Sequence, residues 1–208
     1  MSVRIDPALA DVALSLTDPV NLSRRRFLTG TAIGALVLGF GLPLGSGRVQ
    51  AAVAASVERG TQVPAFLEIR PDSSVRLLCP FMEGGQGIFT AMAQIVGEEL
   101  DVDPASFLVE AAPPGEAYVV MANGMRITGG SMSVRMSYPV MRRLGALARA
   151  MLLQAGAQQL QVPLSELTTE PGKVLHAASG RSLAYGELAE RAMDLPVPDV
   201  DSVQLRDP

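Results

Sequence analysis

Cysteine and histidine are nearly absent from this sequence. Cys79 is the only cysteine and His176 is the only histidine among 208 residues. A single cysteine excludes an internal disulfide framework and any cysteine-rich zinc or iron–sulfur site. One histidine excludes a multi-histidine metal site, and its distance from Cys79 along the chain leaves few routes to a nucleophile–base pair. Chemistry in this chain, if there is any, needs a borrowed cofactor.

Basic clusters are missing after residue 26. The 17 basic residues are outnumbered by 21 acidic ones, so the net charge is −4. Nucleic-acid binding needs a basic surface that neutralises phosphates, so nucleic acid is excluded as a partner. Apolar residues, in contrast, make up 48% of the chain. With the length, they favour one domain of about 100 to 200 residues and a targeting segment.

The N-terminal range 1–54 contains the parts of an export signal in order. A basic segment at 23–28 includes Arg24 and Arg25, 21 uncharged residues run through 27–47, and small residues close the range. The pair Arg24 and Arg25 resembles the twin-arginine address, which directs folded proteins to export. We therefore expect the twin-arginine translocase as a partner and the periplasm as the location.

The alternative for this range is an uncleaved membrane anchor. A run of 21 uncharged residues is long enough to span a bilayer. Its glycines and Pro43 make it only moderately apolar, which is typical of a signal core and unfavourable for a lasting helix in lipid. An uncleaved signal would attach the protein to the inner membrane.

The rest of the chain is expected to be a linker, 55–64, and a folded domain, 65–208. Apolar patterns and turn residues predict a hairpin around Pro71–Ser74, a helix after Gly87, a strand at 107–110, a second helix from Pro139 to about Leu160, a hairpin at 174–183 and a short helix from Tyr185. This order predicts an α+β fold, in which two main amphipathic helices cover one face of a small mixed sheet.

The sequence also predicts where several individual side chains lie. Cys79, at the end of a strand, is expected to be a small buried hydrophobe. His176, beside a hairpin turn, is expected at the surface, and Glu98 and Glu99 on the solvated face of the first helix. The arginines of the second helix are expected to lie away from its core face: Arg142, Arg143 and Arg149.

Two glycine-rich loops are the candidates for a binding site. The loop Glu83–Gly87 precedes the first helix, so its backbone N–H groups suit an anion, although a tight structural turn explains it equally well. The segment 128–135 combines hydroxyls with glycines, which suits a heterocycle or a phosphate, and its alternative is a hydrophilic loop tip. It lies within a long loop, 113–137, of a kind that is usually functional or disordered.

Taken together, five separated motifs resemble one family: Ser23–Leu28, Glu83–Gly87, Glu98–Val102, Thr128–Ser131 and Ser182–Ala189. It is the molybdopterin-binding large subunit of xanthine dehydrogenase/aldehyde oxidase-type molybdenum hydroxylases, in the branch of isoquinoline 1-oxidoreductase beta subunits. The resemblance extends over nearly the whole chain and corresponds to the opening part of a longer subunit, which makes 65–208 part of a molybdopterin-binding domain.

The resemblance implies which residues bind the cofactor. In the first loop they are Gly85, Gln86 and Gly87, and Gly84 stands where the family has methionine. In the second loop they are Thr128, Gly130, Ser131 and Ser133. No catalytic residue and no metal ligand is assigned, because the family's general base belongs to a later region, and the chain alone is expected to be inactive.

The same resemblance implies a function for the whole protein. It is hydroxylation of an aldehyde or N-heterocycle with water as the oxygen source. The cofactor is molybdopterin, with its cytosine dinucleotide form as one option, and the partners are the remainder of the subunit and a 2Fe–2S small subunit. The alternative is a noncatalytic exported remnant or split-gene module that binds the pterin or a sister subunit.

Overall fold

The computed structural model describes residues 36–38, 66–115, 118–121, 124–199 and 202–207. These residues form an α+β fold with two small sheets and three helices, which confirms the predicted class. Two short 3-10 turns, Pro104–Ser106 and Leu164–Glu166, join helices to strands. Among the described residues, no helix is long and apolar enough to span a membrane.

The first sheet has four strands in the order β1-β2-β3-β4. Strands β2 (Leu67–Ile69) and β3 (Val75–Cys79) form the predicted hairpin, whose turn is closed by a hydrogen bond from the Ser74 N–H to Asp72 Oδ1 of 2.9 Å. β4 (Phe107–Ala111) pairs with β3 in parallel, so the sheet is mixed as predicted. A parallel pair needs a crossover connection, and helix α1 (Ile88–Leu100) supplies it.

Strand β1 (Leu36–Leu38) is the edge strand of this sheet and was not predicted. It pairs antiparallel with β2, with Leu36 opposite Ile69 and Leu38 opposite Leu67. Both leucines are buried. The sheet therefore takes one strand from the range 1–54, which the sequence pattern assigns to an export signal. The remainder of that range and the predicted linker lie outside the described residues.

Helix α1 (Ile88–Leu100) begins at the glycine loop as predicted, and helix α2 (Met132–Leu160) ends where predicted. The prediction that α2 begins at Pro139 is wrong. Proline favours the first turn of a helix because it lacks an N–H, but here it lies inside the helix. The added turns pack on α1: Ser137 is buried, donates its hydroxyl to the Ser133 carbonyl at 2.5 Å and lies 3.7 Å from Met92 Sδ.

The second sheet is antiparallel and contains β5 (Leu167–Glu170), β6 (Lys173–His176) and β7 (Arg181–Ala184), followed by α3 (Tyr185–Met193). The hairpin β6–β7 and α3 were predicted. β5 was missed because its sequence, Leu-Thr-Thr-Glu, has one apolar residue and so no apolar alternation. In the structure that residue, Leu167, is the only buried one of the four. Hydrogen bonding to β6 therefore decides its conformation, rather than its own pattern.

His176 is buried, which corrects the expectation of a surface position. The residue is 6% exposed, with Nδ1 2.7 Å from Ser179 Oγ and Nε2 2.9 Å from Glu166 Oε2. Ser179 also accepts a hydrogen bond from Arg181 Nε at 2.9 Å. These contacts satisfy a buried polar ring and hold the β6–β7 turn, which is a structural role.

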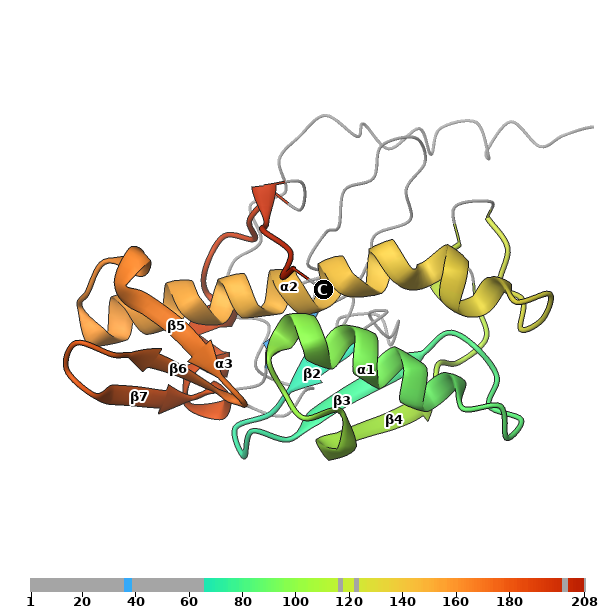
Figure 1. Ribbon diagram of the computed structural model, residues 1–208, viewed down its shortest axis with the longest axis horizontal. Coiled ribbons are helices and arrows are strands. Elements are labelled where there is room, and N and C mark those ends of the chain that lie inside the picture. The colour runs from blue at the N-terminus through green and yellow to red at the C-terminus, as the bar shows by residue number, and fades with distance from the viewer. Residues whose placement is uncertain (1–35, 39–65, 116–117, 122–123, 200–201, 208) are drawn as a thin grey trace, which may run out of the picture.

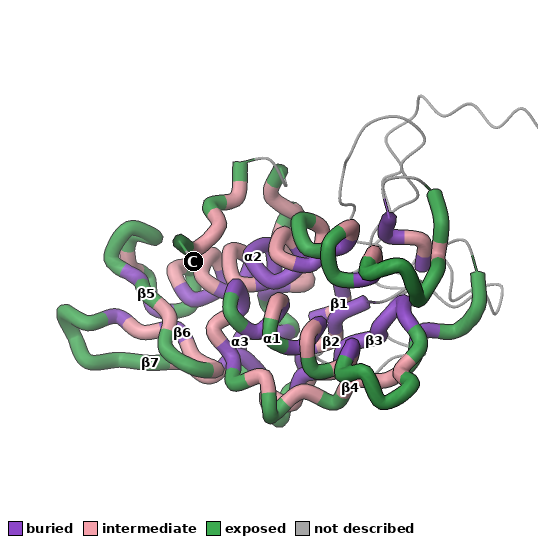
Figure 2. Tube along the Cα trace, turned by 45° about the vertical axis from the view of Figure 1, so that its right-hand side comes forward, coloured by how far each residue is buried: buried purple, intermediate pink, exposed green. Residues whose placement is uncertain are grey.

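Helix α2 connects the two sheets. It extends from the first sheet to β5–β7, with α1 beside it (Figure 1), and α3 packs on it near the second sheet. Purple, buried segments of the trace lie where these helices meet the strands, and the β5–β7 loops are exposed (Figure 2). At Gly145 the two long helices approach so closely that a Cβ would lie 2.4 Å from the Val96 carbonyl oxygen of α1.

Glu99 is fully buried beside this contact, although it was expected in solvent. Its Oε1 accepts a hydrogen bond from Arg142 Nε at 2.6 Å, and its Oε2 lies 3.6 Å from Arg149. Oε2 also accepts the Arg206 N–H at 3.0 Å. Arg142 and Arg149 of α2 therefore bind α1 and the tail of the domain through one carboxylate, whereas Glu98 is exposed as predicted.

We expect Glu99→Gln to destabilise the domain by about 3 to 5 kcal/mol, because it leaves two largely buried guanidinium groups without their counter-charge. Urea unfolding of the 208-residue protein measures the change. Glu98→Gln is the matched control, since it removes an exposed charge on the same turn and should change stability by less than about 0.5 kcal/mol. Equal effects of the two changes would mean that the Glu99 charge is not what holds the helices.

Candidate site between the starts of the two main helices

The first loop turns sharply between β3 and α1. Gly85 and Gly87 have φ of 93° and 82°, a region in which a side chain is strained. The Glu83 carboxylate lies inside this turn and accepts the N–H groups of Gly85, Gly87 and Phe89 at 2.7, 3.1 and 3.0 Å. These hydrogen bonds, that of Phe89 first, lower the pKa of Glu83.

The start of α1 therefore already holds an anion. We expected its N–H groups to be available for a ligand, and the structure corrects this, because Glu83 occupies them. A helix start favours a carboxylate for the same reason that it favours a phosphate, namely unpaired N–H groups and the positive end of the helix dipole. Glu83 thus shapes the loop and excludes a second anion from this position.

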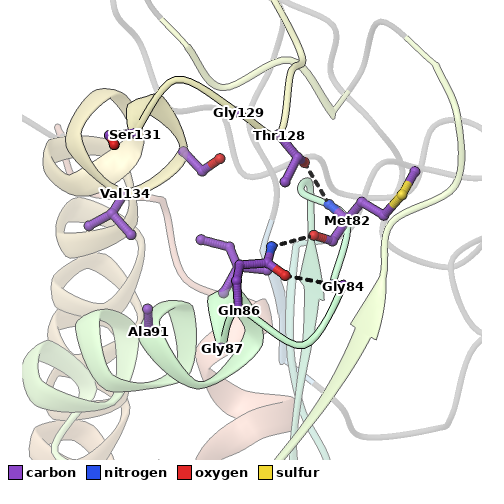
Figure 3. Close-up of a pocket in the computed structure, with 11 residues that line it drawn as sticks. Met82, Gly84, Gln86, Gly87, Ala91, Thr128, Gly129, Ser131 and Val134 are labelled. Atoms are coloured by element: carbon purple, nitrogen blue, oxygen red, sulfur yellow. Dashed lines mark hydrogen bonds between the residues drawn. The ribbon is translucent and has the colours of Figure 1, made fainter.

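Gln86 is held across the loop by both ends of its amide. Its Nε2 donates to the Met82 carbonyl at 2.8 Å, and its Oε1 accepts the Gly84 N–H at 2.6 Å (Figure 3). An amide has two N–H groups and two acceptor lone pairs, so one of each is left for a ligand. At Gly84 a Cβ would lie 3.3 Å from Gln86 Oε1, so the missing side chain gives this amide room.

The second loop is joined to the first by one hydrogen bond. Thr128 Oγ1 accepts the Met82 N–H at 2.8 Å, and Figure 3 shows Thr128 and Gln86 on either side of Met82. Further along, Gly130 and Ser131 have φ of 59° and 55°, and they turn the chain into α2. The prediction that 128–135 precedes the helix is therefore right only up to Ser131, because Ser133 lies in its first turn.

The start of α2 differs from that of α1. Ser131 is its N-cap but makes no side-chain capping hydrogen bond, and the first turn carries no acidic residue. The early N–H groups of this helix therefore have no carboxylate of their own. Of the two helix starts at this site, only that of α2 can receive an anion from outside.

A cavity of about 600 Å³ lies between the two loops. Five of the seven predicted cofactor residues line it: Gln86, Gly87, Thr128, Ser131 and Ser133. Gly85 and Gly130 belong to the same loops but are not among the residues that line the cavity. Gly84, Gly129 and Val134 of the same two candidate segments also line it, together with residues outside these segments: Met82, Ile88 and Ala91. The structure thus brings together two motifs that are about forty residues apart in sequence.

Arg126 supports the two loops that line the cavity, and the sequence did not indicate this role. Its guanidinium donates to the carbonyls of Pro80 at 2.7 Å, Pro113 at 2.5 Å and Ala112 at 2.6 Å. It also lies 5.8 Å from the centre of the Tyr118 ring. Pro80 follows β3 and Ala112 follows β4, so one side chain ties both strand ends to the second loop. A lone arginine carries no sequence signal for such a role.

The donor set suits a polar heterocycle that carries an anionic group. Hydroxyls and amide groups face an otherwise apolar cavity, whose volume is within the range of about 300 to 1,000 Å³ usual for ligand sites. Cys79 is fully buried, as predicted, and this burial raises the pKa of its thiol to about 11. Within the described part of the chain no group of three or more His, Cys, Asp or Glu is placed to hold a metal.

Comparison with known proteins identifies the class that this fold and cavity represent. A family model described as molybdopterin cofactor-binding domain matches residues 22–206. The chain therefore belongs to the molybdopterin cofactor-binding domain family, and the resemblance read from its motifs is confirmed.

Individual proteins are similar to most of this chain. The chain is 34% identical over 181 residues to isoquinoline 1-oxidoreductase subunit beta of Brevundimonas diminuta, and 28% identical over 176 residues to the membrane-bound aldehyde dehydrogenase (pyrroloquinoline-quinone) of Gluconacetobacter polyoxogenes. Each match covers 84% of this chain but 22% of the relative. A solved structure, Cu,Mo-CO dehydrogenase, overlaps 75% of this chain and 18% of its own at 20% identity, with a TM-score of 0.48.

We expect Arg126→Lys to destabilise the domain by about 1 to 3 kcal/mol, because an ammonium group cannot reach three carbonyls arranged for a planar guanidinium. Thermal unfolding of the 208-residue protein measures the loss. Arg135→Lys, an arginine on the exposed side of α2, is the control and should leave the melting temperature unchanged. If both variants melt like the wild type, Arg126 does not hold the loops.

Proposed function

We propose that this chain supplies part of the molybdopterin site of a molybdenum hydroxylase. The observation that carries the proposal is the single cavity lined by both cofactor loops, in a chain that belongs to a molybdopterin-binding family. Because the chain spans about a fifth of the length of the relatives it matches, the remaining walls of the site belong to further polypeptide. When bound, the cofactor supplies molybdenum, the redox centre at which a substrate is hydroxylated with oxygen from water.

The residues of this chain bind and orient the cofactor. Gln86 offers one N–H and one lone pair to the pterin ring, and Thr128 still has its hydroxyl proton to donate. The start of α2, with Ser131 and Ser133, would hold the anionic phosphate, because Glu83 already fills the start of α1. The cytosine dinucleotide form of the cofactor would extend beyond this phosphate.

The substrate class and the partners are part of the same proposal. The relatives are named for isoquinoline, which is an N-heterocycle, and for an aldehyde, so we propose oxidation of one of these classes. Hydroxylation with water releases two electrons, and a 2Fe–2S small subunit is the proposed acceptor. Arg24 and Arg25 direct the folded protein through the twin-arginine translocase to the periplasm, where it remains soluble or attached to the inner membrane.

The cofactor assignment is tested by pterin retention. We expect Ser131→Ala to lower the affinity for the cofactor about five- to 150-fold, which corresponds to about 1 to 3 kcal/mol for a hydrogen bond to a charged group. Because Ser131 makes no capping bond, the melting temperature should not change. Pterin released from the protein, co-expressed with the remainder of the subunit, is quantified by fluorescence after oxidation.

Gln86→Ala is the second variant, and it should lower both pterin content and thermal stability, because its amide also bonds Met82 and Gly84. Thr90→Ala, on an exposed position of α1, is the control. Wild-type pterin content in both Ser131→Ala and Gln86→Ala would show that neither loop contacts the cofactor.

The export proposal is tested separately. We expect that changing both Arg24 and Arg25 to Lys keeps the protein in the cytoplasm, because the receptor reads a guanidinium pair that an ammonium pair does not reproduce. Cell fractionation followed by immunoblotting measures the distribution. Arg48→Lys is the control, since it lies after the apolar run. Undiminished export of the double variant would show that export does not depend on this arginine pair, as expected for the general secretory route.

A further inference from the structure

Strand β1 has the contacts of an integral strand. Leu36 and Leu38 are each 1% exposed, and they are paired in register with Ile69 and Leu67 of β2. The Phe66 N–H donates to the Leu38 carbonyl at 2.8 Å, which extends the ladder to the residue before the start of β2. The Val37 N–H, on the opposite edge, is 3.2 Å from Met193 Sδ at the end of α3. β1 is thus held by a sheet on one side and by α3 on the other.

The burial pattern along β1 is that of a strand rather than of a uniformly apolar segment. Leu36 and Leu38 are buried, whereas Val37 between them is half-buried and lies opposite Glu68. Side chains alternate between the two faces of a sheet, so the period of two follows from the pairing with β2. A helical signal core inserted in a membrane would present these three residues to equivalent apolar surroundings.

The same three residues lie in the uncharged run expected to be the core of an export signal. Cleavage at the small residues Ala51–Ala54 would remove them from the domain. That loss would uncover the edge of β2, and exposed edges bind other strands and promote aggregation. The family match also begins at residue 22, so β1 lies inside the matched domain.

From these observations we infer that Leu36–Leu38 is a permanent strand of the mature domain. The chain is not cut between β1 and β2, and these residues do not remain in a lipid bilayer. Under the proposed export route, the pair Arg24 and Arg25 therefore precedes a segment, Leu36–Leu38, that the folded domain keeps. This inference does not depend on cofactor binding. It can therefore fail while the proposed function holds, and the proposed function can fail while this inference holds.

The first test is the N-terminus of the folded protein. The full-length gene is expressed with a C-terminal tag, and the tagged protein is purified from each cell fraction for intact mass measurement and N-terminal sequencing. We expect every soluble, folded species to contain residues 36–38, whether or not a shorter leader has been removed. A folded species that begins anywhere from residue 39 to residue 66 would overturn the inference.

The second test uses the alternation along β1 in the full-length protein. Leu38→Ala opens a cavity in the core and should lower the melting temperature by roughly 5 to 15 °C. Val37→Ala, which removes two methyl groups from a half-buried side chain on the other face, should lower it by less than about 3 °C. If Leu38→Ala does not fold, Leu38→Val serves as a milder change with a smaller loss. Equal melting temperatures for Leu38→Val, Val37→Ala and wild type would show that β1 is not part of the stable fold.

Discussion

The contact between α1 and α2 is the constraint on which the site depends. Gly145 lets the backbones of the two helices approach, and Glu99 of α1 is buried against Arg142 and Arg149 of α2. A buried carboxylate between two guanidinium groups is stable only while both partners stay in place. Each of the two loops that line the cavity leads directly into one of these helices, so the packing of the helices sets the distance between Gln86 on one loop and Ser131 on the other.

The chain's own hydrogen bonds hold the two loops in place. Glu83 closes the first loop from inside, Thr128 accepts a hydrogen bond from Met82, and Arg126 binds the ends of both neighbouring strands. A site that is already ordered loses less conformational entropy on binding, which favours affinity. The two helix starts also differ in their ability to bind an anion, because the start of α1 is occupied by the Glu83 carboxylate and the start of α2 has no carboxylate. A ligand with one anionic end therefore has one preferred orientation in the cavity.

Much of the fold was predictable because its signals are local. Pro71 and Asp72 specify a turn through their own backbone preferences, and Gly87 marks the start of α1 through its positive φ. The motifs around Gln86 and Ser131 likewise stand in short stretches of sequence, and the family they indicate is confirmed. Errors occurred where a distant partner overrides a local preference. Pro139 suggested a helix start, yet packing of Ser137 on α1 extends α2 past it, and Glu99 looked like a solvated residue until α2 enclosed it.

The sequence by itself therefore determined the fold class, most helices and strands, the family and the two loops, because each depends on neighbours within a few residues. Only the tertiary structure decided that the loops form one cavity, that Arg126 ties them together, and that Leu36–Leu38 completes a sheet. These features join residues tens of positions apart. Their energies come from burial and hydrogen bonds between segments, and no local pattern of residues records which distant segment will supply the partner.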